Sequence, residues 1–248
     1  MSHVPKVLDA FARLLSYPDQ HTAQAAELLY IVLQGEVDEA ASEISKFGSF
    51  LEQSDEWQVE EAFTGTFDVN PACALEVGWH LFGEEYARGM FLVRMREELR
   101  KYDLPESAEL TDHIAHVLAI VAAMPDDQAT SFVKACVQPA IEKMNVALAE
   151  KDSPYRHIMA ALSMVLEAKW GASKPQHHDE ILKSRDANVD PLHAFPVAEV
   201  ECGSGCGSGP EIVPLEASFG DGGDNLGVTD AGLPADGEQE REPGRTQL

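Results

Sequence analysis

The chain has 248 residues, of which 44% are hydrophobic and 25% are charged, a composition that is ordinary for a globular protein. Its 43 acidic residues outnumber 18 lysines and arginines, so the net charge is −25 at pH 7. Such an anion repels phosphate groups, which argues against nucleic acid or anionic lipid as a partner and permits a basic peptide. On charge alone, an acidic surface that only keeps the protein soluble is the simpler interpretation.

Composition divides the chain near Trp170. Six of the 18 glycines precede residue 171, and all three tryptophans lie at or before Trp170. The segment 171–248 is dominated by Ser, Gly, Pro, Asp and Glu, and its only aromatic residues are Phe195 and Phe219. Such a segment cannot bury enough apolar surface to offset the entropy lost on ordering. We therefore predict a helical domain over 1–170 and a largely disordered, acidic, Gly/Pro-rich tail over 171–248.

The sequence contains no segment that predicts export or membrane insertion. Its first residues lack the basic region followed by an apolar stretch that marks a secretory signal. The richest apolar run, Ile114 to Met124, is too short to span a bilayer and contains His116. We therefore expect a cytoplasmic protein without stable membrane insertion.

Apolar residues at helical spacing predict a succession of helices up to Trp170, and no strand-like alternation persists. Pro18 should end the first helix, and Pro139 should kink or split the longest apolar stripe, because proline lacks a backbone N–H. The pattern predicts an all-α, single helical-bundle domain of about eight or nine helices. In chain order the predicted helices cover about 4–15, 25–33, 37–51, 55–63, 72–81, 84–102, 114–124, 129–148 and 154–166, with Ser153 as the N-cap of the last one.

The run from Glu109 to His116 carries the most suggestive polar cluster. Thr111 is a plausible N-cap, and Asp112 at a helix start would interact favourably with the helix dipole. His113 and His116 lie one turn apart, as in a helical metal pair, but no third ligand of a recognised zinc pattern accompanies them. A capped helix start with a hydrogen-bonded histidine is the preferred interpretation. The alternative is a helical metalloprotein or hydrolase that uses Asp112, His113 and His116.

Other motifs give little support for catalysis. Cys202 and Cys206 are separated by three residues in a Gly/Ser segment, which favours two solvated thiols over a metal site. The glycine-rich runs lack the lysine of a phosphate-binding loop, and we find no nucleophile elbow or dinucleotide fingerprint. Phe63 and Phe67 flank a helix break, where they either anchor a loop or border a groove that binds a peptide helix.

Six short segments acquire further significance when they are taken together in chain order. They are Leu14-Leu15-Ser16-Tyr17-Pro18-Asp19, Phe63 to Asp68, His80-Leu81-Phe82-Gly83-Glu84, Arg88-Gly89-Met90, Glu109-Leu110-Thr111-Asp112-His113 and Ser153-Pro154-Tyr155. In this order, across about residues 8–170, they resemble the nitrate reductase delta-subunit family. Its relatives are the maturation chaperones of trimethylamine-oxide and dimethyl-sulfoxide reductases. Thr111 stands where the family has proline and Phe82 where its nitrate reductase branch has histidine, which leaves the particular client open.

The resemblance implies a chaperone without catalytic activity, present as a monomer or weak dimer. Such proteins bind the N-terminal segment of an apo molybdoenzyme catalytic subunit, such as the nitrate reductase alpha subunit or a relative. They assist molybdenum cofactor insertion and complex assembly before membrane docking or export. The client, and not the chaperone, carries the molybdopterin cofactor. The peptide-binding residues that the resemblance implies are Glu109, Asp112, His113, Phe63, Phe67 and Arg88.

A third alternative assigns the binding to the acidic tail. In that case the protein would be an adaptor whose segment 171–248 contacts the partner, and the helical domain would not carry the site.

Overall fold

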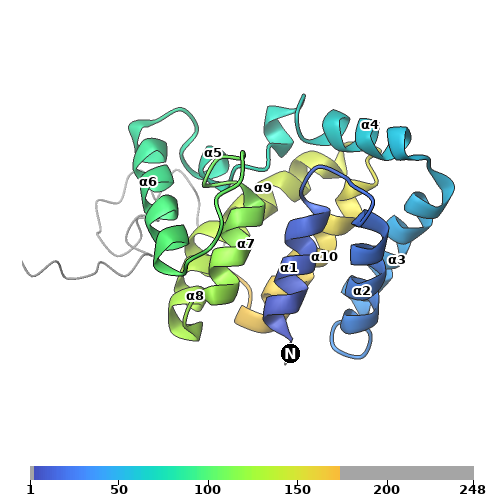
Figure 1. The fold of residues 1–248 in the computed structure, drawn as a ribbon, viewed down its shortest axis with the longest axis horizontal. Helices are drawn as coiled ribbons and strands as arrows, with labels where there is room; N and C mark the ends of the chain where they lie inside the picture. Colours follow the sequence, from blue (N-terminus) through green and yellow to red (C-terminus); the bar gives the residue numbers. More distant parts are fainter. Residues whose placement is uncertain (1–2, 174–248) are drawn as a thin grey trace, which may run out of the picture. The chain divides into compact units, whose positions relative to one another are not determined.

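A computed structural model describes residues 3–173, and this part is helical, with no strand and one isolated β-bridge (Figure 1). A 3₁₀ turn, η1 (Pro71–Cys73), precedes α5, and a π-helical turn, η2 (Val133–Val137), joins α8 to α9. The α-helices are α1 (Val4–Leu14), α2 (Thr22–Leu33), α3 (Asp38–Gln53), α4 (Glu56–Thr66), α5 (Val77–Phe82), α6 (Tyr86–Lys101), α7 (Ile114–Ala123), α8 (Asp126–Phe132), α9 (Gln138–Ala149) and α10 (Tyr155–Trp170).

This architecture confirms the predicted all-α fold. If α8, η2 and α9 are counted as one continuous helix, the described part of the chain holds nine helices. The predicted tail, 171–248, lies outside the described residues except for its first three positions. None of the helices between residues 3 and 173 combines the length and the apolar character that crossing a membrane requires.

The predicted helix over 72–81 is wrong in its first half. Pro71 begins the 3₁₀ turn η1, and regular helix resumes only at Val77. Between them, the main chain of Leu75 and Val77 bonds to a distant segment, through Ile114 N to Leu75 O at 2.8 Å and Val77 N to Asp112 O at 2.9 Å. These groups cannot take part in a helix at the same time, so the tertiary contact replaces the local one.

Pro139 perturbs its helix as predicted. The N–H of Gln138 donates to Val133 O, five residues back, which defines the π turn η2 immediately before the proline. In a regular α-helix the proline ring would clash with the carbonyl of the residue four positions earlier. The wider turn accommodates the ring, and α9 then continues to Ala149.

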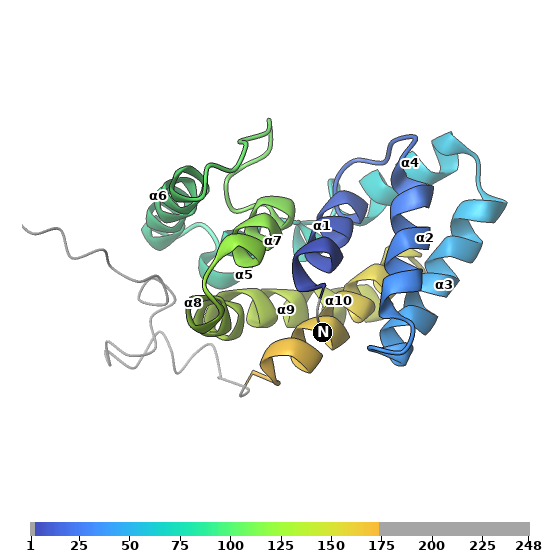
Figure 2. The ribbon, with the colours of Figure 1, turned by 60° about the horizontal axis from the view of Figure 1, so that its bottom comes forward.

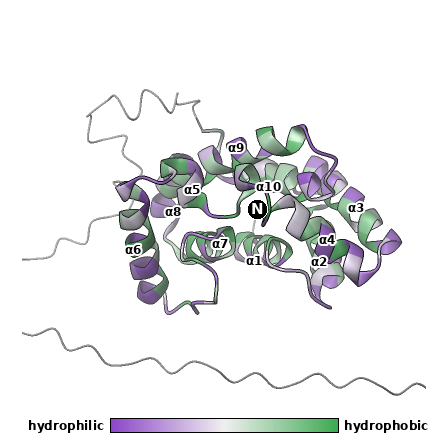
Figure 3. Cartoon of the chain, turned by 90° about the horizontal axis from the view of Figure 1, so that it is seen from above, coloured by the Kyte–Doolittle hydropathy of each residue, from purple (hydrophilic) through white to green (hydrophobic). Residues whose placement is uncertain are grey.

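The core lies between helices that are distant in sequence. α1 packs against α7, and α10 packs against α3; Figures 1 and 2 both show α1 beside α7. α7 is coloured hydrophobic over almost its whole length in Figure 3, whereas α6 alternates between hydrophobic and hydrophilic residues. A helix that is apolar on all sides must be surrounded by protein, which explains why α7 is central and α6 is peripheral.

Two adjacent leucines of α2 test this division between core and surface. Leu29 is 1% exposed, whereas Leu28 is 54% exposed. We expect Leu29→Ala to lower the free energy of unfolding by about 2–5 kcal/mol, because it leaves a cavity in the core. Leu28→Ala should change it by less than about 0.5 kcal/mol. Urea denaturation followed by helical circular dichroism measures both, and similar losses in the two variants would contradict the packing of α2.

Candidate functional site

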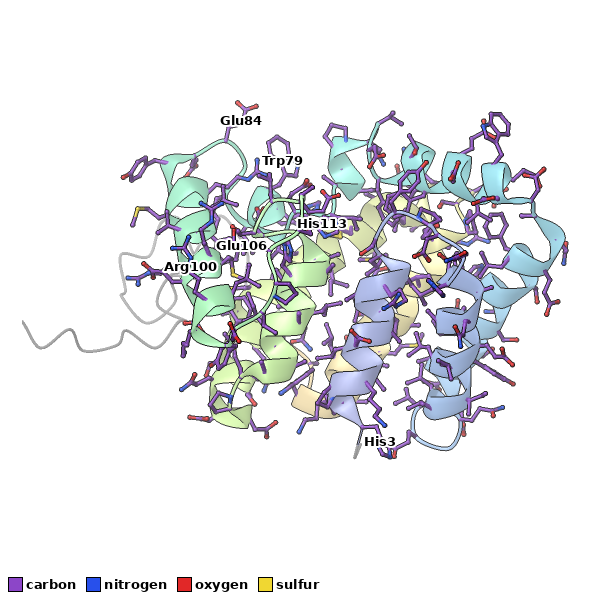
Figure 4. The ribbon with its side chains drawn as sticks, viewed as in Figure 1. His3, Trp79, Glu84, Arg100, Glu106 and His113 are labelled. Atoms are coloured by element: carbon purple, nitrogen blue, oxygen red, sulfur yellow. The ribbon has the colours of Figure 1, made fainter. Side chains whose placement is uncertain are left out.

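A pairing of two distant segments creates the site. Glu76 and His113 form an antiparallel bridge, flanked by the two main-chain hydrogen bonds of Val77 and Ile114. The bridge brings the start of α5 against the start of α7, so the segment after Pro71 meets the segment after Glu109. Figure 4 shows Trp79 of α5 close to His113, and far from His3.

A pocket of about 480 Å³ opens beside this bridge. Its walls come from the α1–α2 connection, from α4 and its C-terminal end, from α5 and the segment leading into it, from α6 and from the loop before α7. The lining residues are Tyr17, Phe63, Phe67, Asp68, Pro71, Ala74, Leu75, Glu76, Trp79, Arg88, Glu109 and His113.

One wall of the pocket is aromatic. Phe63 and Phe67 stack edge-to-face with ring centroids 5.1 Å apart, and Tyr155 of α10 lies behind both, at 5.5 Å and 5.2 Å. Tyr17 meets Phe63 at 5.7 Å and is 54% exposed at the rim. Phe63 and Phe67 therefore do both of the things considered from the sequence, because they anchor α4 in the core and also face the pocket.

Trp79 of α5 also lines the pocket. Its indole Nε1 donates a hydrogen bond to Pro71 O at 2.9 Å, which fixes the ring against the segment before α5. The guanidinium of Arg88 lies over the ring, with its carbon 5.5 Å from the centroid. A cation over an indole face is an attractive arrangement, and it holds both side chains at the pocket wall.

The pocket carries an excess of negative charge. Three carboxylates line it, those of Asp68, Glu76 and Glu109, and within residues 3–173 none of them forms an ion pair. The single cationic side chain in the lining is that of Arg88, which is directed at a buried acid. Because the local charge is not neutralised from within, a cationic group in the pocket would gain electrostatic energy.

Asp112 lies behind the pocket and does not line it. The side chain is 0% exposed, and its Oδ2 is 3.5 Å from Arg88 Nε, which is an ion-pair distance. Neither carboxylate oxygen has a hydrogen-bond partner among the described residues. Burial raises the pKa of this carboxyl above its ordinary value, and Glu76 adds to the effect, whereas Arg88 opposes it. Asp112, one of the six peptide-binding residues that the resemblance implied, therefore does not face the pocket.

The N-cap of α7 is His113, and not Thr111 as the sequence suggested. His113 Nδ1 accepts the N–H of Ala115 at 3.2 Å, while Thr111 Oγ1 donates to Leu92 O on α6 at 2.9 Å. Burial lowers the pKa of His113 to about 4, and His116 acts in the same direction while Glu76 opposes it. The ring is therefore neutral at neutral pH, as an accepting nitrogen requires.

His116 does not form a metal pair with His113. Its Nδ1 is 2.9 Å from Leu110 O, and its Nε2 is 3.2 Å from the backbone nitrogen of Ser107. Both ring nitrogens therefore already have protein partners. Among residues 3–173, no group of three or more His, Cys, Asp or Glu side chains is arranged to hold a metal ion.

The structure thus brings together five of the six residues that the family resemblance implied and places Asp112 behind them. Sequence reasoning missed the remaining polar and aromatic lining. Tyr17 belongs to a motif that had been noticed, but nothing in the spacing indicated that it faces Phe63. Trp79 and Glu76 carried no local signal, because the bridge that orients them is a tertiary contact. The four missed residues are Tyr17, Asp68, Glu76 and Trp79.

Gly78 is required for the buried position of Asp112. A Cβ at position 78 would lie 2.6 Å from Asp112 Oδ2 and 2.9 Å from Phe91 Cδ1. We expect Gly78→Ala to lower the free energy of unfolding by about 1–3 kcal/mol, because the added methyl group would overlap two fully buried side chains. The matched control is Gly89→Ala on α6, whose Cβ would meet nothing within 4 Å. It should be neutral or slightly stabilising in urea denaturation, and equal effects of the two changes would contradict the close approach.

The depressed pKa of His113 predicts a loss of stability on acidification. Between its ordinary pKa of 6.5 and about 4, the unfolded chain binds a proton that the folded chain excludes. The stabilisation is therefore complete above pH 6.5 and is lost as the pH falls toward 4. His113→Asn keeps an acceptor for the N-cap but does not titrate. Between pH 7 and 4.5 the native protein should lose about 1–3 kcal/mol more unfolding free energy than this variant; parallel curves would refute a neutral, buried His113.

Comparison with known proteins assigns the family. No curated protein matches the chain significantly. The model of the family described as "Nitrate reductase delta subunit" matches residues 33–161, which run from the end of α2 into α10. Every residue lining the pocket except Tyr17 falls within this range. The match covers more than half of the chain, and the chain belongs to the nitrate reductase delta-subunit family.

Proposed function

We propose that this protein is a cytoplasmic chaperone that binds the N-terminal segment of an apo molybdoenzyme catalytic subunit, that of a nitrate reductase or a relative. Binding would protect this segment while the molybdenum cofactor is inserted and the complex assembles, before membrane docking or export. The cofactor belongs to the client. The proposal rests on one observation, the pocket that combines an aromatic wall with three carboxylates that are not paired within the described chain.

The chemistry of the pocket favours a basic amphipathic peptide. Aromatic rings supply apolar contact area, and the carboxylates of Asp68, Glu76 and Glu109 supply attraction for lysine, arginine or a free amino terminus. A volume of about 480 Å³ accommodates a few side chains and not an entire helix. The peptide would therefore insert one or two anchor residues here and lie across the surrounding surface, as helices do in recognition grooves.

The same geometry argues against the alternative function, that of a helical metalloprotein or hydrolase. That function needs Asp112, His113 and His116 to face a common substrate or ion. Asp112 is buried against Arg88, and His113 Nδ1 caps α7. His116 has both nitrogens engaged by the chain itself. A binding role uses the residues in the positions they occupy, whereas a catalytic role would require these contacts to break.

Two tryptophans provide a test of the proposed site. Trp79 lines the pocket, whereas Trp57 of α4 is exposed and does not line it. We expect Trp79→Ala to weaken binding of a peptide with the N-terminal sequence of the cognate catalytic subunit by at least about tenfold, because buried aromatic anchors dominate such interfaces. Trp57→Ala should leave the Kd unchanged. Isothermal titration calorimetry on the full-length chain measures both.

Two further measurements complete this experiment. Binding to the native protein should weaken as salt is added, because the carboxylates attract a basic ligand through charges that salt screens. Thermal unfolding of each variant shows whether Trp79→Ala remains folded. Absence of binding to the native chain would refute the proposed function, and equal binding by both variants would move the site elsewhere, as the acidic-tail adaptor alternative requires.

A further inference from the structure

The α6–α7 loop, residues 102–113, carries Glu109 to the edge of the pocket. Its two ends are attached to α6. Near the first end, Leu104 N donates to Leu99 O at 2.9 Å, and near the second, Thr111 Oγ1 donates to Leu92 O at 2.9 Å. Glu109 lies between these attachments, in a stretch without regular secondary structure.

The middle of the loop is held by His116, which projects back from α7. Its Nδ1 is 2.9 Å from Leu110 O, and its Nε2 is 3.2 Å from Ser107 N and 3.1 Å from Ser107 Oγ. Ser107 Oγ also accepts the N–H of Glu109 at 3.1 Å. One buried imidazole therefore bonds to the residues immediately before and after the short segment that contains Glu109.

The partners of His116 determine its tautomer. A main-chain carbonyl can only accept, so Nδ1 must carry the hydrogen that is donated to Leu110 O. A main-chain N–H can only donate, so Nε2 must be bare in order to accept from Ser107. The hydroxyl of Ser107 accepts from Glu109 N and is free to donate to the same Nε2. Only the neutral ring with hydrogen on Nδ1 satisfies all of these contacts.

Other contacts to this loop are weaker or lie elsewhere. Glu106 pairs with Arg96 at 3.3 Å and with Arg100 at 3.7 Å, but these side chains are exposed, and exposed ion pairs contribute little. Figure 4 shows Glu106 beside Arg100, on the α6 side of the loop, with His113 where the loop ends. The main-chain bond from His113 N to Leu110 O fixes only the C-terminal side of Glu109.

We infer that His116 is a positioning residue of the site. As a neutral imidazole it links Ser107 to Leu110 through a set of hydrogen bonds, termed the clasp, and so holds the carboxylate of Glu109 at the pocket. The inference rests on the proposed function in one respect, because it takes Glu109 to attract a cationic group of the bound peptide. The clasp itself is a property of the free protein. His116 touches no ligand and acts through the loop.

A double-mutant cycle tests the positioning role in the full-length chain. His116→Phe removes the hydrogen bonds of both ring nitrogens, and Glu109→Gln removes the charge that the ring positions. Each change alone should weaken binding of the N-terminal peptide of the catalytic subunit by about five- to tenfold. The double variant should bind about as weakly as Glu109→Gln alone, because His116 then has no charge left to position. The inference would be overturned if the affinity of the double variant fell by the product of the two single losses, or if His116→Phe bound the peptide with native affinity.

Readouts on the free protein separate this inference from the proposed function. Nitrogen NMR should show hydrogen on Nδ1 of His116, and the Glu109 amide should exchange with solvent at least about tenfold faster in His116→Phe. Hydrogen on Nε2, or unchanged exchange, would refute the clasp even if the peptide binds. If the native chain binds no peptide, the proposed function fails, and these readouts still decide whether the clasp exists.

A second variant covers the case in which His116→Phe does not fold. Ser107→Ala removes the hydroxyl that links Glu109 N to the ring but leaves the main-chain bond to Nε2. It should speed Glu109 amide exchange and weaken peptide binding in the same direction, by about two- to fivefold. The control is Ser45→Ala on the exposed side of α3, which should change neither. Equal behaviour of the two serine variants would count against the clasp.

Discussion

Two main-chain hydrogen bonds, from Val77 to Asp112 and from Ile114 to Leu75, join the start of α5 to the start of α7, and the rest of the site depends on this pairing. It prevents the segment before α5 from continuing as helix, and it places Glu76 opposite His113. The parts of the pocket lining contributed by α5 and by the α6–α7 loop lie next to each other because of it. A short extended pairing in a helical protein is thus a means of bringing two helix starts together at one opening.

The pairing also explains the unusual environment of Asp112. Its carboxylate is confined between Gly78, Phe91 and Arg88, in a space that exists only because position 78 has no side chain. Removing a carboxylate from water is costly unless a nearby cation compensates it. Arg88 supplies that cation while its guanidinium also lies over Trp79. The buried acid therefore acts on the pocket indirectly, through the arginine that it orients.

Two histidines one helical turn apart have different structural roles at the same helix start. His113 accepts from the first turn of α7, and His116 connects α7 to the loop that carries Glu109. Each role requires a neutral ring with a specified nitrogen available. The spacing that suggests a metal pair in the sequence is used here for two separate hydrogen-bonded supports, and their partners are groups whose positions the spacing does not reveal.

The sequence by itself determined the helical class, the interruption of a helix at Pro139, and the short motifs that gather around the site. These features follow from local periodicity and from the covalent geometry of residues such as Pro139. Only the tertiary structure decided that Asp112 is behind the pocket, that His113 and not Thr111 caps α7, and that Tyr17 and Trp79 complete the lining. Each of these depends on which distant group a side chain or an N–H meets. Such a choice is made by packing between segments far apart in the chain, and it leaves no signal in the local pattern of residues.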